Sequence, residues 1–336
     1  MDKVIIIAEA GVNHNGSLDL AKNLVDIASE SGADYVKFQT FKAENLVTKH
    51  AKLADYQSEG ITNSKNQLNM LKTLELSQKS LKELSLYCRK RNIKFLSTPF
   101  DIDSLLFLDS LDMPLIKIAS GEITNLPLLR SIGELKKETI MSTGMSSISE
   151  ISQAMKILIS SGLDSSKITL LQCNTEYPTP INDVNLRAMV ELRKKFGTRI
   201  GYSDHTLGIN IPIAAVALGA KIIEKHFTLD KSMNGPDHKS SLDSFELKSM
   251  ILGIREIEFA LGSKEKFITK SEMKNLSLVR KSIVAKINIS KGEKFSIKNL
   301  TTKRPGNGIS PMYWDDLIGN ASNANYEPDD QIIYEF

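Results

Sequence analysis

Two histidines in this chain of 336 residues are candidate metal ligands, because each lies at the end of an apolar segment. His205 ends the segment GYSDH and His226 ends the segment KIIEKH, and both segments have the apolar character of buried strands. Neighbouring strands in a sheet lie about 5 Å apart, so the two imidazoles could reach one ion if these strands are adjacent. Two nitrogen ligands with open positions and nearby oxygens suit Mn²⁺, Fe²⁺ or Zn²⁺. The alternative is a pair of structural histidines that hydrogen-bond neighbouring loops.

Two lysines lie within apolar segments, which is an unfavourable place for a charge. Lys37 belongs to YVKFQ and Lys117 to LIKIAS. A buried ammonium group is costly unless it meets an anion, so the pair predicts a doubly charged ligand such as a phosphate or a carboxylate. A compatible alternative is an ion pair with Glu9 or Glu122, at the ends of the first and fourth apolar segments. These carboxylates are also candidates for general acid–base catalysis or for holding a substrate hydroxyl.

Small polar residues occupy several turns that follow the apolar segments. Residues 120–121 (Ser-Gly) and 142–144 (Ser-Thr-Gly) supply hydroxyls and exposed backbone amides, which bind phosphate well. The sequence Gly-Pro-Asp-His at residues 235–238 has the composition of a turn. Another turn, Arg-Pro-Gly-Asn-Gly at residues 304–308, carries an arginine suited to bidentate recognition of a carboxylate or phosphate. The alternative for Arg304 is a solvated surface side chain.

These residues are placed by eight short apolar runs that end in polar or charged residues, and seven of the runs are followed by a helix-like stretch. Eight is the number of parallel strands that closes a β/α barrel, and such barrels carry their chemistry at the C-terminal ends of the strands. We therefore expect an α/β fold of the (β/α)8 TIM-barrel class with its active site at that end. The runs cover residues 4–9, 35–39, 94–98, 115–120, 139–143, 168–174, 199–204 and 221–226.

Helix signals fall between the runs. Ser17 can cap a helix that ends at Gly32, and the capping-box pattern at residues 147–150 begins a helix that ends at Gly162. One connection is anomalous, because residues 40–77 separate the second run from its helix. A long insertion on this side of a barrel is typical of a lid or a substrate-contacting loop. Further helices are expected over residues 184–196, 211–218 and 244–261.

The pattern changes after Gly262. Residues 1–262 are predicted to form the catalytic barrel, and the charged, weakly patterned residues 263–278 to form a linker. From Val279 onward short strand-like pieces alternate with turns. Residues 279–336 are therefore predicted to form a small β-rich domain.

The composition limits the class of protein. Net charge is +3 and the lysines are scattered, so we expect no nucleic-acid partner. No apolar run approaches the roughly 20 residues that span a bilayer, and the run before Glu9 is too short for the core of a signal peptide. The two cysteines, Cys88 and Cys173, do not make a disulfide framework. A reducing, cytoplasmic location without membrane partners is therefore expected.

Ten motifs follow one another along nearly the whole chain: AEAGVNHNG, VKFQTF, STPFD, KIASGE, STGM, CNTEYPTP, GYSDHTLG, EKHFTLDK, GPDH and KRPGNGISP. Together they resemble the sialic acid synthase family. Its members condense phosphoenolpyruvate with an N-acylated hexosamine to give a nine-carbon 2-keto acid. Their C-terminal (SAF) domain is similar to type III antifreeze proteins. The resemblance thus implies a TIM barrel followed by a small antifreeze-like β-rich domain.

The resemblance implies roles for the residues that match the motifs of the family. His205 and His226 would bind a divalent cation, usually Mn²⁺ in this family, with Mg²⁺ or Co²⁺ as alternatives. Glu122 would lie beside the reacting carbons. Phosphoenolpyruvate would be held by Lys117, Ser120, Ser142 and Ser203, with Lys37 and Thr98 nearby. The sugar side would be lined by Tyr177, Glu9 and Asp237.

Two further implications concern the phosphate and the partner subunit. Some family members have asparagine two positions before the tyrosine equivalent to Tyr177, whereas this chain has Thr175 there and Asn174 one step earlier. Either residue could contact the phosphate. Arg304 would reach the N-acyl group of the sugar from the small domain of a partner subunit. The expected assembly is a homodimer with the C-terminal domain swapped onto the partner barrel.

The resemblance implies the reaction of an N-acetylneuraminate synthase, which would join phosphoenolpyruvate, N-acetylmannosamine and water to give N-acetylneuraminic acid and phosphate. The first alternative is a legionaminic or pseudaminic acid synthase, which uses a 2,4-diacetamido-2,4,6-trideoxy hexose. A more distant one is a metal-dependent hydrolase on the same barrel, which would have no use for two buried lysines. An ice- or carbohydrate-binding role for the C-terminal domain is disfavoured by its charged residues, among them Lys291, Glu293 and Lys294.

Overall fold

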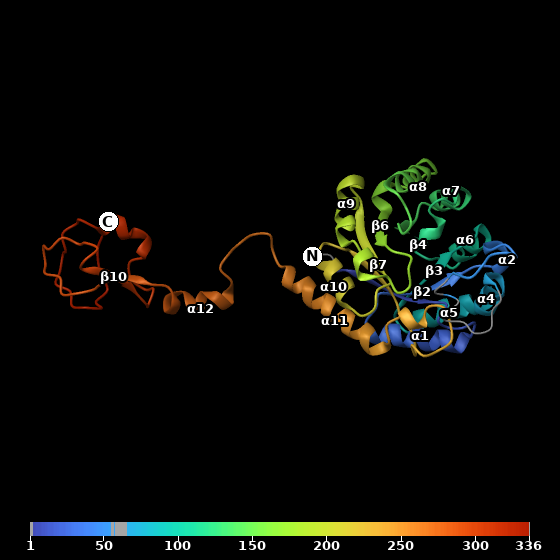
Figure 1. Cartoon of the computed structure of the whole chain (residues 1–336), viewed down its shortest axis with the longest axis horizontal. Coiled ribbons are helices and arrows are strands. Elements are labelled where there is room, and N and C mark those ends of the chain that lie inside the picture. The colour runs from blue at the N-terminus through green and yellow to red at the C-terminus, as the bar shows by residue number, and fades with distance from the viewer. Residues whose placement is uncertain (1–2, 55–56, 58–65, 336) are drawn as a thin grey trace. The chain divides into compact units, whose positions relative to one another are not determined.

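The computed structural model describes residues 3–54, 57 and 66–335 of the chain. It contains two compact units, one ending at Gly262 and the other beginning at Ser263 (Figure 1). Each unit has its own buried apolar core. The candidate site residues belong to the first unit, except Arg304, which belongs to the second.

The first unit is built on eight parallel strands, which confirms the predicted TIM barrel. In the hydrogen-bonding order β3-β2-β1-β8-β7-β6-β5-β4 every neighbouring pair is parallel. β1 lies between β2 and β8, and β3 and β4, at the two ends of this order, are in contact. The strands are β1 (Ile5–Gly11), β2 (Tyr35–Thr40), β3 (Lys94–Pro99), β4 (Leu115–Ile118), β5 (Glu138–Ser142), β6 (Ile168–Cys173), β7 (Arg199–Asp204) and β8 (Ile222–His226).

Helices connect the strands and lie around them (Figure 1). The predicted caps are present: the Ser17 hydroxyl accepts a hydrogen bond from Leu20 N at the start of α1, and Ser147 forms a capping box with Glu150 at the start of α8. These caps satisfy backbone amides that have no partner within the helix. The main helices of the barrel are α1 (Leu18–Ser31), α5 (Gln78–Lys90), α6 (Ile102–Asp109), α7 (Leu126–Leu135), α8 (Ile148–Ser160), α9 (Leu186–Phe196), α10 (Asn210–Ala217) and α11 (Ser244–Leu261).

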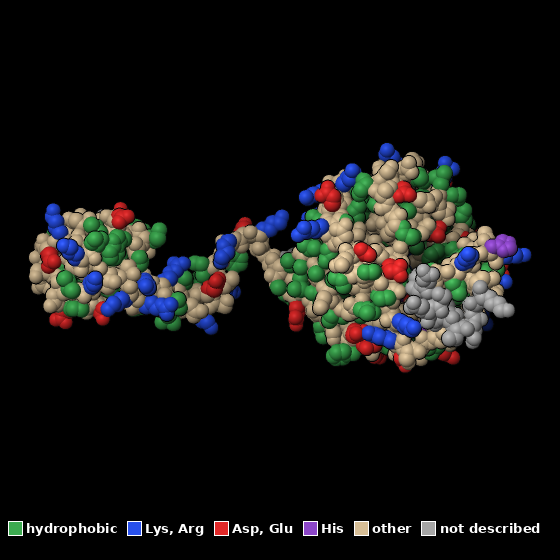
Figure 2. Space-filling model, viewed as in Figure 1, with side chains coloured by type: hydrophobic (Ala, Val, Ile, Leu, Met, Phe, Trp, Pro, Cys, Tyr) green, Lys and Arg blue, Asp and Glu red, His purple; other side chains and the backbone are tan. Residues whose placement is uncertain are grey.

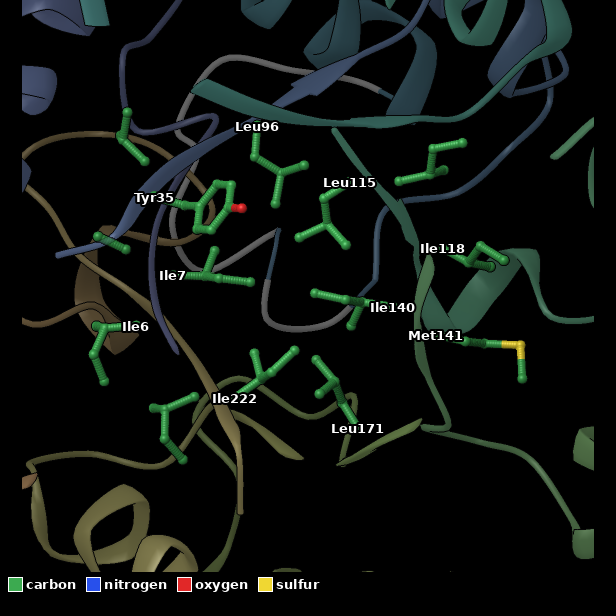
Figure 3. Packing of buried hydrophobic residues seen from close by; sticks show 14 of the residues in the cluster. Ile6, Ile7, Tyr35, Leu96, Leu115, Ile118, Ile140, Met141, Leu171 and Ile222 are labelled. Carbon is green, nitrogen blue, oxygen red and sulfur yellow. The ribbon is translucent and has the colours of Figure 1, made fainter. Parts of the chain in front are cut away.

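An apolar layer fills part of the barrel interior. Seven strands each contribute one large side chain to it, and these side chains point toward one another in Figure 3. β7 has Gly201 instead, where a Cβ atom would lie 2.5 Å from Leu171 Cδ2, so this strand needs glycine for its close approach. Each buried aliphatic side chain contributes about 1.5–3 kcal/mol. The following residues are called the apolar floor: Ile7, Tyr35, Leu96, Leu115, Ile140, Leu171 and Ile222.

The insertion at residues 40–77 forms a small core of its own. It contains two described helices, α2 (Ala43–Leu46) and α4 (Gln67–Leu74), while residues 55–56 and 58–65 lie outside the described part of the chain. Its apolar side chains pack on the loop after β1, which anchors the insertion on the side where the strands end. The core consists of Val12, Phe41, Ala43, Met70, Leu71 and Leu74.

The second unit begins with a helix that the sequence analysis did not predict. Residues 263–278, predicted as a linker, contain most of α12 (Lys270–Val279). Its N-terminus carries a capping box, in which Glu272 accepts hydrogen bonds from the amide and hydroxyl of Thr269. No residue of α12 is buried. Its apolar residues Met273, Leu278 and Val279 are exposed, and the charged residues around them gave the segment the composition of a linker.

The rest of the second unit is a small β-rich fold. β9 (Ser282–Ala285) and β10 (Leu300–Lys303) pair antiparallel, and the short helix α13 (Trp314–Leu317) follows. Short strand-like pieces were predicted from Val279 onward, and one of them, FSIKNL at residues 295–300, overlaps β10 only at Leu300. The core of this unit consists of Ile283, Ala285, Ile289, Phe295, Leu300, Leu317, Tyr326 and Ile332.

The surfaces of both units mix charges of the two signs on the face shown in Figure 2. Among the helices described, none combines the length and the apolar character needed to cross a bilayer. Cys88 and Cys173 are both buried and both free.

Candidate active site

A layer of buried polar side chains lies directly above the apolar floor. Side chains two positions apart on a strand point to the same face, so a strand that places one residue in the floor places the residue two positions later in this layer. Ile7 is thus followed by Glu9, and Ile222 by Glu224. All eight strands contribute, and their residues are called the polar layer: Glu9, Lys37, Thr98, Lys117, Ser142, Cys173, Ser203 and Glu224.

Two lysines and two carboxylates form one ion cluster within the polar layer. Lys37 Nζ lies 3.0 Å from Glu9 Oε2 and 3.6 Å from Glu224 Oε2. Lys117 Nζ lies 3.7 Å from Glu224 Oε1. The predicted pairing of Lys37 with Glu9 is confirmed. Lys117 was predicted to pair with Glu9 or Glu122. In the described structure Lys117 instead forms its ion pair with Glu224, which was not among the predicted site residues.

Burial and mutual attraction set the protonation of the ion cluster. Burial raises the pKa of Glu9 to about 7, against the attraction of Lys37. Burial also disfavours ionised Glu224, but Lys117 and Lys37 outweigh it and hold the pKa of Glu224 below its usual value. For Lys117 burial outweighs the attraction of Glu224, so the pKa of this ammonium group is lowered. Near neutral pH a partly protonated Glu9 therefore leaves the two ammonium groups incompletely neutralised.

Hydroxyl groups complete the polar layer. Thr98 Oγ1 accepts a hydrogen bond of 3.0 Å from Lys37 Nζ, and Ser203 Oγ donates one of 3.0 Å to Glu224 Oε1. Ser142 Oγ is buried and has no hydrogen-bond partner among the described residues. Because buried polar groups are normally paired, the Ser142 hydroxyl is suited to meet a polar ligand above the layer.

The loops after β4, β5 and β6 meet closely at Gly144. The Ser120 hydroxyl accepts a hydrogen bond of 3.0 Å from the Gly144 amide. A Cβ atom at residue 144 would lie 2.7 Å from Thr175 Cγ2 and 2.8 Å from Ser120 Oγ, so any side chain there would push the loops apart. Asn174, in contrast, is engaged in its own turn, since its Oδ1 accepts a hydrogen bond of 2.8 Å from Glu176 N. This arrangement favours Thr175 over Asn174 as the residue beside the predicted phosphate-binding turn.

His205 and His226 lie next to each other, with ring centroids 5.5 Å apart. Tyr177 stacks on His205 at 4.0 Å between centroids, and its hydroxyl lies 3.0 Å from His205 Nε2. Burial lowers the pKa of His205 to about 4 and that of His226 well below its usual value. Both imidazoles are therefore neutral at physiological pH, which is the form that binds metal ions.

The contacts of these rings fit part of a metal centre. His205 Nδ1 donates to the carbonyl oxygen of Asn174, an outer contact typical of metal-binding histidines. Nε2 would then be the ligand atom, and an ion there would take the place of the Tyr177 hydroxyl, which lies 3.0 Å from it. His226 Nδ1 is buried without a hydrogen-bond partner in the described structure, and Asp237 Oδ2 lies 3.9 Å from it. The described residues contain no group of three or more His, Cys, Asp or Glu side chains placed to hold an ion. Within this part of the chain, a cation bound by the two imidazoles would therefore need its other ligands from substrate or water.

The remaining predicted residues lie on loops around this centre. Glu122 follows β4 and accepts a hydrogen bond of 2.6 Å from Asn125 Nδ2, and burial raises its pKa. Asp237 is buried in the loop after β8, and burial raises its pKa to about 6. In the second unit Arg304 is exposed on a turn that Ser282 holds, since its hydroxyl donates to Pro305 O at 2.7 Å. The turn is therefore fixed without the arginine side chain.

Sequence reasoning missed two members of the polar layer. Glu224 lies two positions before His226, so alternation along β8 already places the two side chains on one face. The Cys173 thiol lies 3.9 Å from His205 Nδ1. Burial raises the pKa of Cys173 to about 11, which keeps the thiol protonated at neutral pH and argues against a thiolate nucleophile.

A further buried histidine, His14, lies in the loop after β1. Its Nδ1 accepts a hydrogen bond of 3.0 Å from Gly16 N, and its Nε2 is buried without a hydrogen-bond partner in the part of the chain described. Burial lowers the pKa of His14 to about 4. Protonation at Nδ1 would break the bond to Gly16, so the fold favours the neutral ring.

Acid is therefore expected to destabilise the fold through His14. Unfolded histidine protonates near pH 6.5 and folded His14 near pH 4, so its contribution is complete above pH 6.5 and is lost as the pH falls to 4. The full shift corresponds to about 3 kcal/mol. His14→Asn keeps an acceptor for Gly16 but does not titrate, so its free energy of unfolding, measured with denaturant, should fall less between pH 7 and pH 4.5 than that of the parent. Equal losses would show that His14 is not responsible.

The first unit is thus a parallel barrel. The C-terminal ends of its strands carry paired lysines, carboxylates and two neutral histidines. A small β-rich domain follows the barrel in the chain. Residues 24–266 match the NeuB family, and residues 280–334 match the SAF domain. The chain belongs to the NeuB family, which confirms the resemblance to the sialic acid synthases.

Relatives of this chain are synthases of nonulosonic acids. N,N'-diacetyllegionaminic acid synthase of Campylobacter jejuni is 54% identical over 332 residues, which cover 99% of this chain and 99% of the relative. N-acetylneuraminate-9-phosphate synthase of Homo sapiens is 36% identical, over 98% of this chain and 91% of the relative. Among solved structures, the N-acetylneuraminic acid synthetase of Leptospira borgpetersenii, in complex with citrate, has a TM-score of 0.73 and 35% identity and covers 82% of this chain and 90% of that one.

Proposed function

We propose that this protein is an N,N'-diacetyllegionaminic acid synthase, which condenses phosphoenolpyruvate with a 2,4-diacetamido-2,4,6-trideoxy hexose and releases phosphate. The observation that carries the proposal is the 54% identity to the Campylobacter jejuni enzyme of that name, across 99% of both chains. The identity to the human N-acetylneuraminate-9-phosphate synthase is 36%. N-acetylmannosamine, the acceptor first predicted from the motifs, is therefore less well supported than the diacetamido sugar.

Phosphoenolpyruvate is expected to bind over the ion cluster. Lys37 and Lys117 supply two ammonium groups for its carboxylate and phosphate, and the buried Ser142 hydroxyl supplies a further donor. The donor competes with Glu9 and Glu224 for the lysines. Because the pKa of Glu9 is already about 7, this carboxylate can take up a proton when the anion arrives, which removes one repulsive charge. A hydrolase would gain nothing from these lysines, whereas an anionic donor requires them.

Bond formation joins C3 of phosphoenolpyruvate to the open-chain aldehyde carbon of the sugar. A divalent cation held by His205 and His226, with Mn²⁺ as first choice, would supply Lewis-acid polarisation of that aldehyde. Positive charge then develops at C2 of the donor, where Glu122 directs water, since burial moves its pKa toward neutral pH. The oxygen of this water adds to C2, and one of its protons passes by way of Glu122 to the former aldehyde oxygen. The other proton leaves with phosphate when the C–O bond between C2 and the phosphate breaks and C2 becomes a keto carbon. Lys37 and Lys117 neutralise the departing anion.

The substrate test measures phosphate release from phosphoenolpyruvate with Mn²⁺ and either the diacetamido sugar or N-acetylmannosamine. The proposal predicts a kcat/KM at least about tenfold higher for the diacetamido sugar, and loss of the reaction with a chelator. Preference for N-acetylmannosamine would return the assignment to N-acetylneuraminate synthase. Absence of phosphate release with every nonulosonic acid precursor would refute the synthase proposal itself.

Arg304 is proposed to complete the sugar site of a partner subunit, whose barrel supplies Tyr177, Glu9 and Asp237. Arg304→Ala is expected to raise the KM for the sugar at least about tenfold, the value of one lost charge-assisted hydrogen bond. The melting temperature should not change, because Arg304 is exposed and Ser282 holds its turn. The exposed Lys298→Ala in the same unit is the matched control and should leave the KM unchanged.

Mixing of subunits tests whether the arginine acts in trans. Arg304→Ala subunits keep an intact barrel, and Lys117→Met subunits keep an intact arginine. If Arg304 serves the partner barrel, a mixed dimer regains one working site and activity rises on mixing. No recovery after exchange of subunits would place Arg304 on the site of its own chain.

A further inference from the structure

A buried ion pair lies behind the two histidines, on the outer face of β7 and β8. Asp204 and Lys225 are direct partners in the register of these strands, and each comes one position before a histidine. Because side chains alternate along a strand, Asp204 and Lys225 point away from the polar layer, while His205 and His226 point over it. Lys225 Nζ lies 2.5 Å from Asp204 Oδ2, and neither side chain has exposed surface.

The pair also holds the backbone on the far side of His205. Lys225 Nζ donates a hydrogen bond to the carbonyl oxygen of Thr206. Asp204 accepts hydrogen bonds from Thr206 N at 3.1 Å and from Thr206 Oγ1 at 3.0 Å. Thr206 is itself fully buried. The peptide that carries His205 is thus tied, on both sides of the histidine, to the strand that carries His226.

Stability alone does not account for this arrangement. Moving two charges out of water is costly, and a buried ion pair is often no more stabilising than apolar side chains of similar volume. Apolar side chains, however, do not direct hydrogen bonds to a particular amide and carbonyl group. The specific consequence of Asp204 and Lys225 is therefore geometric. The groups nearest to the pair whose position could matter are the two imidazoles, whose ring centroids are 5.5 Å apart.

We propose that Asp204 and Lys225 are positioning residues, which fix His205 relative to His226 without touching the substrate. The inference rests on the proposed function in one respect, since the two histidines are taken to bind the cation. Contacts of this outer kind typically contribute ten- to hundredfold to metal affinity.

The test replaces the pair by apolar residues of similar size, Asp204→Leu together with Lys225→Met. The affinity of the substrate-free protein for Mn²⁺, measured from the EPR signal of free Mn²⁺, is expected to fall ten- to hundredfold. The melting temperature in chelator should stay within a few degrees of the parent, because the charges leave together. A crystal structure of the double variant should show the rings of His205 and His226 displaced from their 5.5 Å separation.

A matched control is Arg255→Met, which breaks an ion pair with Asp34, the residue before β2. Arg255 Nη2 lies 3.2 Å from Asp34 Oδ2. The Mn²⁺ affinity of this variant should equal that of the parent. Unchanged affinity and unchanged ring placement in the double variant would overturn the positioning role. If the parent binds no Mn²⁺, the metal part of the proposed function fails, and ring placement alone decides the inference. Should the double variant not fold, Lys225→Arg takes its place, since a guanidinium group does not reproduce the contacts of a compact ammonium group.

Discussion

His226→Ala is expected to abolish turnover, with kcat reduced by at least about a thousandfold. The proposed cation would lose one of its two protein ligands, and Lewis-acid stabilisation of developing charge amounts to several kcal/mol. A loss of about 4 kcal/mol corresponds to a thousandfold in rate. Phosphate release at saturating phosphoenolpyruvate and sugar, over a series of Mn²⁺ concentrations, measures the effect. Excess Mn²⁺ should not restore the rate, because one histidine does not hold the ion in place.

His238→Gln is the matched control for this substitution. His238 is also buried, and burial lowers its pKa to about 4. Both of its ring nitrogens have partners, however, with Nδ1 2.7 Å from Thr228 Oγ1 and Nε2 3.2 Å from Asn15 Oδ1. This variant should keep most of its activity. Activity retained in His226→Ala, or lost equally in the two variants, would make His226 a structural residue.

The fold itself should tolerate the loss of His226. Its Nδ1 has no hydrogen-bond partner among the described residues, so the alanine variant leaves no protein group newly unpaired at that atom. A melting temperature close to that of the parent, measured in chelator, would assign the loss of turnover to the chemistry. A collapse of stability would instead show that the ring supports the barrel.

Alternation along the strands could have predicted more of the site than the ends of the apolar runs did. A lysine inside an apolar run is conspicuous, so Lys37 and Lys117 were found. Glu224 is less conspicuous, because the run that contains it ends in a histidine. Yet Ile222, Glu224 and His226 share one face of β8 by the period of two, as Tyr35 and Lys37 do on β2.

The partners within the ion cluster could not be predicted in the same way. Glu224 reaches Lys37 because β8 pairs with β1, and β1 pairs with β2. It also reaches Lys117, which comes from β4, a strand that is not its neighbour in the sheet. Contacts across a barrel depend on the tilt and stagger of the strands, which a single sequence does not state. Residue types and depth in the barrel were therefore predictable, and the pairing was not.

The sugar substrate could not be predicted from the sequence motifs, for a chemical reason. The resemblance assigns the quoted motifs to the donor, the cation and the sugar aldehyde, which all of the proposed reactions would share. N-acetylmannosamine and the diacetamido sugar differ at C4 and C6, away from the reacting aldehyde. Similarity along the whole chain therefore gave the better guide, with 54% identity to a legionaminic acid synthase against 36% to the human sialic acid enzyme.

Glu224→Gln is expected to bind phosphoenolpyruvate more tightly and to turn it over more slowly. Glu224 lies 3.6 Å from Lys37 and 3.7 Å from Lys117, so it competes with the donor for both lysines. Removal of its charge should lower the Kd of phosphoenolpyruvate about tenfold, which is a gain of about 1.4 kcal/mol. The rate should fall because Glu224 also fixes the position of the ammonium groups, and a misplaced donor loses its orientation. Without the donor, Lys117 loses its carboxylate partner while Lys37 keeps Glu9, and the free energy of unfolding should fall by about 3 kcal/mol.

Glu9→Gln is the control for Glu224→Gln. It shows whether a change in phosphoenolpyruvate binding comes from the lost charge or from replacing a carboxylate by an amide. At pH 6, below its pKa of about 7, Glu9 is mostly protonated, so this substitution changes the charge of the ion cluster little. Glu224, whose pKa is lowered, remains ionised there, and Glu224→Gln removes a full charge. Calorimetry with phosphoenolpyruvate at pH 6, without sugar so that no turnover occurs, should therefore show tighter binding in Glu224→Gln alone. At pH 8, where Glu9 is ionised, Glu9→Gln should tighten binding as well. Equal affinities of parent and both variants at pH 8 would mean that the donor does not bind these lysines, and that the ion cluster only supports the barrel.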